Sequence, residues 1–145
     1  MIDQAKKRAL IERIKRIGFS NQTETLLTVE EYFDGYDADS CMICANNTPS
    51  VSTSEFRRHL AQIRSDSRVH DVYIRFYDFL DAEKSDDCWI NSDMVFLVTT
   101  ATPQEVEQWF APLQGDEAYE ETDLQAFVNP PVIPDGYRLV GIGWD

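Results

Sequence analysis

Basic residues are scarce over most of this 145-residue chain. Residues 21–145 carry seven Lys and Arg against 24 Asp and Glu, a balance of −17. The other six basic residues fall within the first twenty positions, where the balance is +4, and the whole chain carries −13. Such an acidic surface repels nucleic acid and anionic membranes and attracts basic surfaces over long range. The sequence therefore predicts a basic protein partner, with no nucleic acid and no membrane.

Long apolar runs and paired cysteines are also missing. No stretch approaches the ~20 apolar residues of a membrane helix, and the charged first twenty residues hold no apolar signal-peptide segment. Three cysteines, an odd number, do not make a disulfide framework. With 43% apolar residues the chain can nevertheless bury one core. We expect a reduced, cytoplasmic, single-domain protein over residues 1–145, with a basic N-terminal helix at 1–20 and an α+β body at 28–145.

Recognisable catalytic and metal-binding motifs are absent as well. The chain has no Gly-x-Ser-x-Gly sequence. Cys41 and Cys44 form a Cys-x-x-Cys pair, but no second pair accompanies it. The segment also predicts a strand, in which residues three apart point to opposite faces. An EF-hand loop from Asp37 would need Gly and Glu where Met42 and Thr48 stand. We therefore expect no catalytic residues, no metal site and no cofactor.

Hydrophobic periodicity and capping residues predict the helices and strands. Apolar residues at helical spacing over 3–17 predict an N-terminal helix that ends at Gly18. Capping boxes at Thr28 and Ser52, and a Thr-Pro-Gln-Glu sequence from Thr102, each begin a helix. Apolar runs predict strands at 41–45, 72–77, 94–98 and 137–144.

From residue 41 onward the predicted order is strand, helix, strand, strand, helix, strand. This is the order of the ferredoxin-like split βαβ arrangement, whose right-handed crossovers place both helices on one face. The predicted fold class is α+β, a ferredoxin-like βαββαβ antiparallel sheet with helices on one face, plus an extra N-terminal helix. That helix either covers the core of the acidic domain, which we favour, or lies on a membrane surface.

Carboxylates and aromatic residues interleave in two segments. Aromatic residues are enriched at interface hot spots, and acidic fields speed encounter with basic partners. The alternative is that the carboxylates are merely solvated and the aromatic side chains belong to the core. We favour that alternative for segment 116–123, as a charge-rich connector. Segment 30–39 is the candidate partner-binding site, with Glu30, Glu31, Asp34, Tyr36, Asp37 and Asp39 as its members.

The stretch Leu-Thr-Val-Glu-Glu-Tyr-Phe-Asp-Gly at 27–35 precedes an acidic loop and a short apolar run. It resembles a segment of small, acidic, mostly uncharacterised bacterial proteins, and the terminal Gly143-Trp144-Asp145 adds to the resemblance. Some proteins of this kind are immunity proteins that neutralise a secreted toxin. The resemblance covers about a quarter of the chain and transfers no catalytic residue. It implies binding rather than catalysis.

Three functional hypotheses follow from these observations. The leading one is a non-enzymatic acidic protein-binding domain, an immunity or inhibitor protein that neutralises a basic toxin such as a nuclease. The second is a small ligand-binding or regulatory ferredoxin-like module. The sequence leaves open whether the chain is a monomer or a dimer. The third is a metal-dependent phosphoryl-transfer enzyme that uses Asp86 and Asp87 with Asp78 and Asp93. Fold alone does not choose among them.

Overall fold

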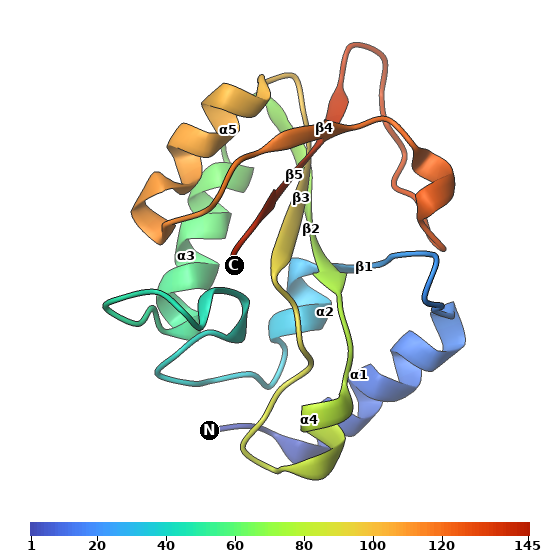
Figure 1. Cartoon of the computed structure of the whole chain (residues 1–145), viewed down its shortest axis with the longest axis vertical. Coiled ribbons are helices and arrows are strands. Elements are labelled where there is room, and N and C mark those ends of the chain that lie inside the picture. The colour runs from blue at the N-terminus through green and yellow to red at the C-terminus, as the bar shows by residue number, and fades with distance from the viewer.

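The computed structural model describes residues 1–145 as an α+β fold built on one antiparallel sheet (Figure 1). Its five strands lie in the order β1-β2-β3-β5-β4. They are β1 (Thr25–Thr28), β2 (Val69–Phe76), β3 (Met94–Thr99), β4 (Tyr119–Glu121) and β5 (Arg138–Gly143). The helices are α1 (Gln4–Ile17), α2 (Val29–Phe33), α3 (Thr53–Arg64), α4 (Leu80–Lys84) and α5 (Pro103–Phe110). Single 3₁₀ turns lie at Met42–Cys44, Ala111–Leu113 and Leu124–Ala126.

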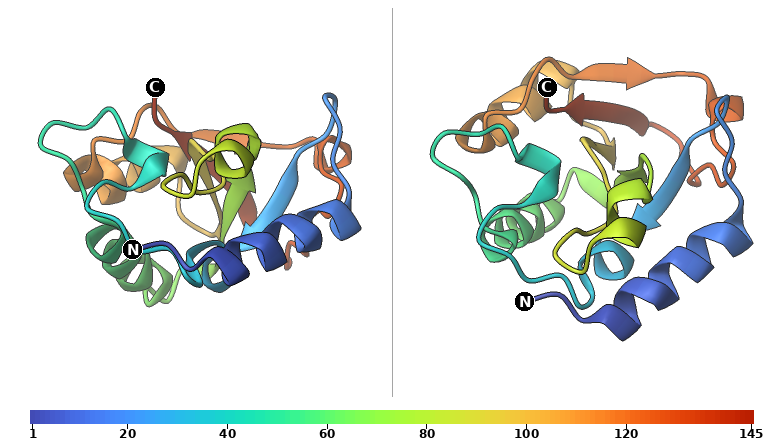
Figure 2. Two further views of the ribbon diagram at one scale, coloured as in Figure 1. Left: turned by 90° about the horizontal axis from the view of Figure 1, so that it is seen from below. Right: turned by 60° about the horizontal axis from the view of Figure 1, so that its bottom comes forward.

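Helices cover one face of the sheet, and an irregular segment covers part of the other (Figure 2). A cluster of 33 buried residues joins α1, α2, α3 and α5 to the inward side chains of the strands. On the opposite face Phe96 and Leu139 belong to a smaller cluster with Phe127, whose ring meets Phe96 edge-on at 5.3 Å. The predicted α+β class with an antiparallel sheet is confirmed.

The helix starts follow the capping residues of the sequence. Thr28 and Thr102 each accept a hydrogen bond from the backbone N–H of a glutamate three residues later. The side chain of each glutamate in turn accepts from the backbone N–H of the threonine, which completes a capping box. Ser52 accepts from the backbone of Glu55 at 3.2 Å and begins α3. These side chains satisfy backbone N–H groups that lack a helical partner. The three predicted helix starts are confirmed.

The predicted strand at 41–45 is wrong. Met42–Cys44 forms a 3₁₀ turn, and its apolar residues Ile43 and Cys44 are buried in the main core without entering the sheet. A short apolar run is compatible with any buried conformation, and length and periodicity do not distinguish them. The first strand is instead β1, four residues long and buried on both faces, which pairs antiparallel with β2.

The ferredoxin-like arrangement is not confirmed. In a split βαβ unit a helix joins two parallel strands, and a third strand lies between them. Here α2 and α3 connect β1 to its direct antiparallel neighbour β2, and α5 lies between β3 and its antiparallel neighbour β5. The segment predicted as a charge-rich connector contributes β4, which pairs with the outer side of β5. The coarser α+β class stands.

Helix α1 lies against the body through one apolar face. Leu10, Ile11 and Ile14 are buried in the main core, while the basic residues of its last turn point outward. Asp3 caps its first turn by accepting from the N–H of Lys6 at 3.1 Å. The apolar face of α1 is therefore buried within its own chain. No helix in the structure has both the length and the apolar character needed to cross a membrane.

Candidate partner-binding surface

Two carboxylates of the predicted 30–39 site face the basic helix α1. Lys6 Nζ donates to Asp34 at 2.7 Å, and Arg13 Nε donates to Glu31 at 3.0 Å. The hydrogen bond to Asp34 raises the pKa of Lys6. The helix can approach this closely because Gly35 has no side chain, and a Cβ there would lie 2.7 Å from Cβ of Lys6. The basic helix therefore neutralises part of the acidic segment within the same chain.

Glu30 and Tyr36 also have partners within the chain, Glu30 at the surface and Tyr36 in the core. Arg64 of α3 donates to Glu30 at 2.5 Å, and this hydrogen bond lowers the pKa of Glu30. The buried ring of Tyr36 stacks on Trp89 with centroids 5.1 Å apart, and its hydroxyl accepts from the N–H of Met42 at 2.9 Å. Burial raises the pKa of Tyr36. In this structure Tyr36 is a core residue.

Asp37 and Asp39 lie at the surface without an ion pair to a side chain, whereas the exposed Glu30 and Asp34 each pair with a basic side chain. The carboxylate of Asp37 lies 3.5 Å from the N-terminal ammonium, in a pair that is 99% and 81% exposed. Asp39 is exposed and has no ion pair. Asp37 also lines a shallow pocket of about 280 Å³ together with Asp86 and Asp87. The structure thus places the exposed end of the predicted site beside a second acidic segment.

This second segment carries five carboxylates without an ion pair. It comprises α4 and its flanks, between the end of β2 and the start of β3. Lys84 is the single basic residue within it. The five carboxylate residues are Asp78, Asp81, Glu83, Asp86 and Asp87. Asp78 is half-buried, and the other four are exposed.

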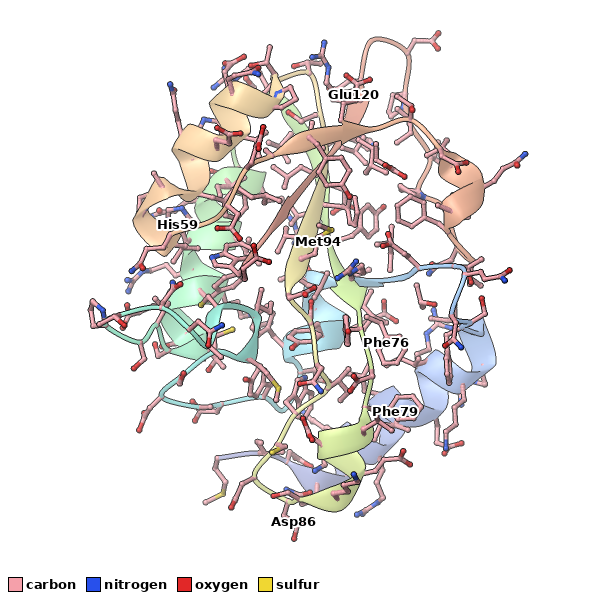
Figure 3. The ribbon with its side chains drawn as sticks, in the orientation of Figure 1. His59, Phe76, Phe79, Asp86, Met94 and Glu120 are labelled. Atoms are coloured by element: carbon pink, nitrogen blue, oxygen red, sulfur yellow. The ribbon has the colours of Figure 1, made fainter.

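Exposed apolar side chains lie beside Asp78, the first of these carboxylates. Figure 3 labels Phe79 and Asp86, which flank α4 at its two ends. Phe19 is 47% exposed, and Tyr77 and Leu80 are each 60% exposed. All three line a pocket of about 200 Å³ with Phe76 and Phe79, whose rings lie 5.3 Å apart. We call the combined set the α4 surface: the carboxylates Asp78, Asp81, Glu83, Asp86 and Asp87 with the apolar residues Phe19, Tyr77 and Leu80.

The α4 surface rests on a buried lysine of helix α1. Lys7 is only 4% exposed, and its ammonium donates to the carbonyls of Ala82, Ser85 and Cys88 at 2.8, 2.9 and 3.1 Å. No carboxylate lies within ion-pair distance of this ammonium. Because one cation binds three carbonyls along the segment, it fixes the backbone that carries the exposed carboxylates.

The carboxylates considered for phosphoryl transfer do not converge. Asp93 accepts from Arg75, which also donates to Glu24 at 2.9 Å. Asp78 accepts from the side chain of Asn91 at 2.7 Å. No group of three or more His, Cys, Asp or Glu side chains in the chain is arranged to hold a metal ion.

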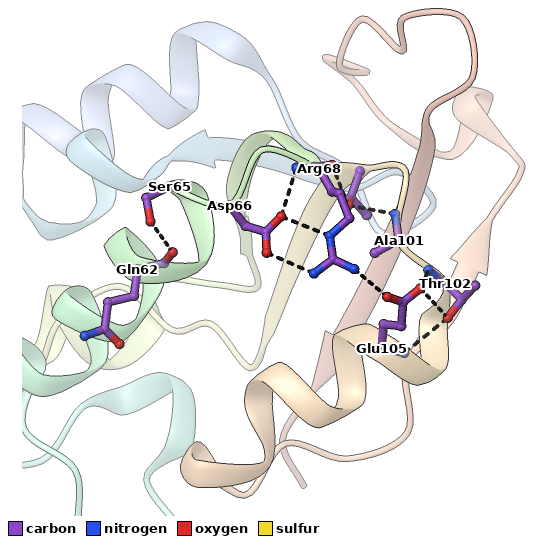
Figure 4. Close-up of polar contacts among 8 residues, drawn as sticks. Gln62, Ser65, Asp66, Arg68, Ala101, Thr102 and Glu105 are labelled. Carbon is purple, nitrogen blue, oxygen red and sulfur yellow. Dashed lines mark hydrogen bonds and ion pairs between the residues drawn. The ribbon is translucent and has the colours of Figure 1, made fainter.

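A third polar cluster joins the turn after α3 to the start of α5 (Figure 4). Arg68 donates to Asp66 through Nε and Nη2, both at 3.0 Å, and to Glu105 at 2.6 Å. Its guanidinium also lies 4.9 Å from the ring centroid of Trp109. The hydrogen bonds from Arg68 hold the pKa of Asp66 at about 2. Since every charge in this cluster is paired within it, the cluster fixes the two elements to one another.

Comparison with known proteins gives a family. The family model described as "Uncharacterized protein YfbO family" matches residues 5–142. The chain belongs to the YfbO family. It is 30% identical over 146 residues to the uncharacterized protein YfbO of Escherichia coli (strain K12), a match that covers 93% of this chain and 98% of that protein. No solved structure matches the chain.

The YfbO family match contains every element that builds the α4 surface. Residues 5–142 include nearly all of α1 and β5, the whole of α4 and the other four strands. Lys7, Phe19 and segment 77–87 therefore lie within the shared region. The surface is part of the family domain and not an appendage to it.

Proposed function

We propose that this YfbO-family protein is a non-enzymatic binding domain that holds a basic protein partner on its α4 surface. The observation that carries the proposal is the coincidence of five carboxylates without an ion pair and two exposed apolar side chains on one segment, with the exposed Phe19 packed against it. The carboxylates attract a basic partner from a distance and select against acidic ones. The apolar side chains supply the area whose burial stabilises the complex.

The partner surface that fits is basic with an apolar centre. Asp81, Glu83, Asp86 and Asp87 are exposed, so they retain full hydration until a cation approaches. Leu80 begins α4, directly before Asp81, and presents most of its side chain to solvent. An apolar contact with charged residues at its rim is typical of protein interfaces. The resulting affinity is expected to fall as salt screens the charges.

An immunity or inhibitor role is the specific form of this proposal. A domain with a net charge of −13 can occupy the basic cleft of a toxin such as a nuclease, where its carboxylates take the place of phosphates. Such a protein needs a rigid acidic surface and no catalytic group. The anchoring of α4 by Lys7 supports the first requirement.

A ligand-binding module is the second candidate, and a single feature favours it. A groove of about 400 Å³ lies between α1 and α4, within the size range of small-molecule sites. Its walls carry opposite charges, Arg8 and Lys15 on α1 against Glu83 and Asp86 on the other side. Native mass spectrometry of the purified protein distinguishes the two candidates, because a retained small molecule favours the module.

The test of the leading proposal is capture of a partner with matched charge variants. Glu83→Lys/Asp87→Lys alters the α4 surface, and Glu117→Lys/Asp135→Lys makes the same change in charge elsewhere. All four carboxylates are exposed, and none has an ion pair or a side-chain hydrogen bond. The wild type and the control variant should capture the same basic protein from a lysate of the native cell at low salt. The α4 variant should lose it.

Two results would contradict the proposal. One is equal capture by both variants, which would place the interface elsewhere. The other is the absence of any stoichiometric basic partner at low salt, which would favour the ligand-binding module.

A further inference from the structure

The two cysteines of the Cys-x-x-Cys sequence lie on one 3₁₀ turn. Cys41 is the N-cap of the turn Met42–Cys44, and the N–H of Cys44 donates to the carbonyl of Cys41 at 3.3 Å. A 3₁₀ helix has three residues per turn, so side chains three apart lie on the same side. A strand would have separated the two thiols, and the turn brings them together.

The spacing and surroundings of the two thiols suit a disulfide. Three residues at a rise of about 2.0 Å place their Cα atoms roughly 6 Å apart, within the range of natural disulfides. Both side chains are buried, with 0% and 1% exposed. The thiol–thiol hydrogen bond raises the pKa of Cys41 and lowers the pKa of Cys44. Cys44 is accordingly the more nucleophilic partner, and Cys41 holds the proton.

The third cysteine provides an internal comparison. Cys88 is half-buried, and its backbone carbonyl binds Lys7. It follows α4 in the chain. Cys88 is the most accessible of the three thiols, but it has no second cysteine three residues away with which to form a disulfide.

We propose that Cys41 and Cys44 form a reversible disulfide on exposure to hydrogen peroxide. The thiolate of Cys44 attacks one peroxide oxygen, the O–O bond breaks, and the sulfur becomes a sulfenic acid as hydroxide leaves. The sulfur of Cys41 then attacks the sulfenic sulfur and displaces hydroxide, which takes up the proton from Cys41. The hydroxide from the first step takes up the proton that Cys44 released on ionising, so the two sulfurs lose two electrons to the peroxide and two molecules of water form. A small dithiol reverses the reaction by exchange.

Access to the buried pair comes from the loop that carries it. Ser40 and Ala45, on either side of the turn, are exposed. The turn is a single 3₁₀ segment of three residues. Local opening of this loop, at a lower free energy than global unfolding, gives peroxide access to the thiols. This modification site does not depend on the partner-binding proposal.

The experiment treats the reduced, folded full-length protein with hydrogen peroxide and then labels free thiols with an alkylating agent. We expect two of the three thiols to become protected and Cys88 to remain alkylated. Peptide mapping without reduction should show Cys41 and Cys44 linked within one peptide. Dithiothreitol should restore three labelled thiols. The control variant Cys88→Ser should form the same linked peptide.

Other outcomes would overturn the inference. These are a disulfide that includes Cys88, three thiols that stay free, and oxidation that dithiothreitol does not reverse. The variant Cys41→Ser should lose the protection of Cys44 from irreversible oxidation. If that variant does not fold, the wild-type and Cys88→Ser measurements decide alone. Loss of the selective pairing in urea would show that the folded turn directs it.

Discussion

The buried ammonium of Lys7 should be a large single contributor to the stability of the α4 segment. The substitution Lys7→Met keeps most of the apolar stem and removes the charge. It leaves the carbonyls of Ala82, Ser85 and Cys88 without the donor that each now has at 2.8 to 3.1 Å. Hydrogen bonds to a charged donor contribute about 1.5–3 kcal/mol each, but burial of the ammonium offsets part of that sum.

The expected destabilisation is about 2–4 kcal/mol, below three full bonds because Ser85 and Cys88 are half-buried and their carbonyls can gain water. For a domain of this size it corresponds to a fall in Tm of roughly 4–16 °C. Urea unfolding followed by Trp fluorescence measures the difference. The matched control is Lys6→Met, one residue earlier on the same helix, whose lysine pairs with Asp34 at the surface.

The control variant should unfold close to the wild type, since exposed ion pairs contribute little. Equal midpoints for Lys7→Met and Lys6→Met would refute the reasoning. A large loss in Lys7→Met should be accompanied by faster amide exchange in the α4 segment, because the lysine acts on that backbone.

Three further predictions address the ion pairs, the sheet and a helix cap. The pKa of Asp66 is about 2 because of Arg68, so this pair stabilises the fold above pH ~4 and its contribution is lost as pH falls toward 2. Arg68→Gln should move the pKa of Asp66 back toward 3.8 in an NMR titration. Gly141→Ala should destabilise the fold by about 1–3 kcal/mol in urea, because the new Cβ would lie 2.7 Å from the buried ring of Phe96. Thr28→Ala should cost about 1 kcal/mol in the same assay, and an unchanged midpoint would exclude a role for its capping box.

Local signals determined which parts of the fold were predictable from sequence. Capping residues and helical periodicity located α1, α2, α3 and α5, because these signals depend on neighbours within one turn. The strands β2, β3 and β5 followed from apolar alternation or continuous apolar runs. Strand β1 has four residues and adjoins a helix cap, so it offered no period to detect. The strand order depends on pairing across the chain, which no local pattern encodes.

The contacts of the predicted 30–39 site were hidden in the sequence for a similar reason. Glu31 and Asp34 look free in the sequence, but Arg13 and Lys6 come from a helix some twenty residues or more away. Tyr36 alternates with carboxylates and nevertheless packs on Trp89 in the core. Asp37, at the far end of the predicted site, lines a pocket with Asp86 and Asp87 of the α4 surface. The detectable signal of that surface was an apolar pair, at positions 79 and 80, inside an acidic stretch.

Affinity for the captured partner tests the α4 surface most directly. Titration calorimetry with the purified partner should be run for the wild type, Leu80→Ala and Glu83→Lys/Asp87→Lys at low and raised salt. We expect Leu80→Ala to weaken Kd by about tenfold, as for a central apolar contact. We expect the charge variant to bind weakly and to lose most of the salt dependence that the wild type shows. The same Kd and the same salt dependence for all three proteins would contradict the account.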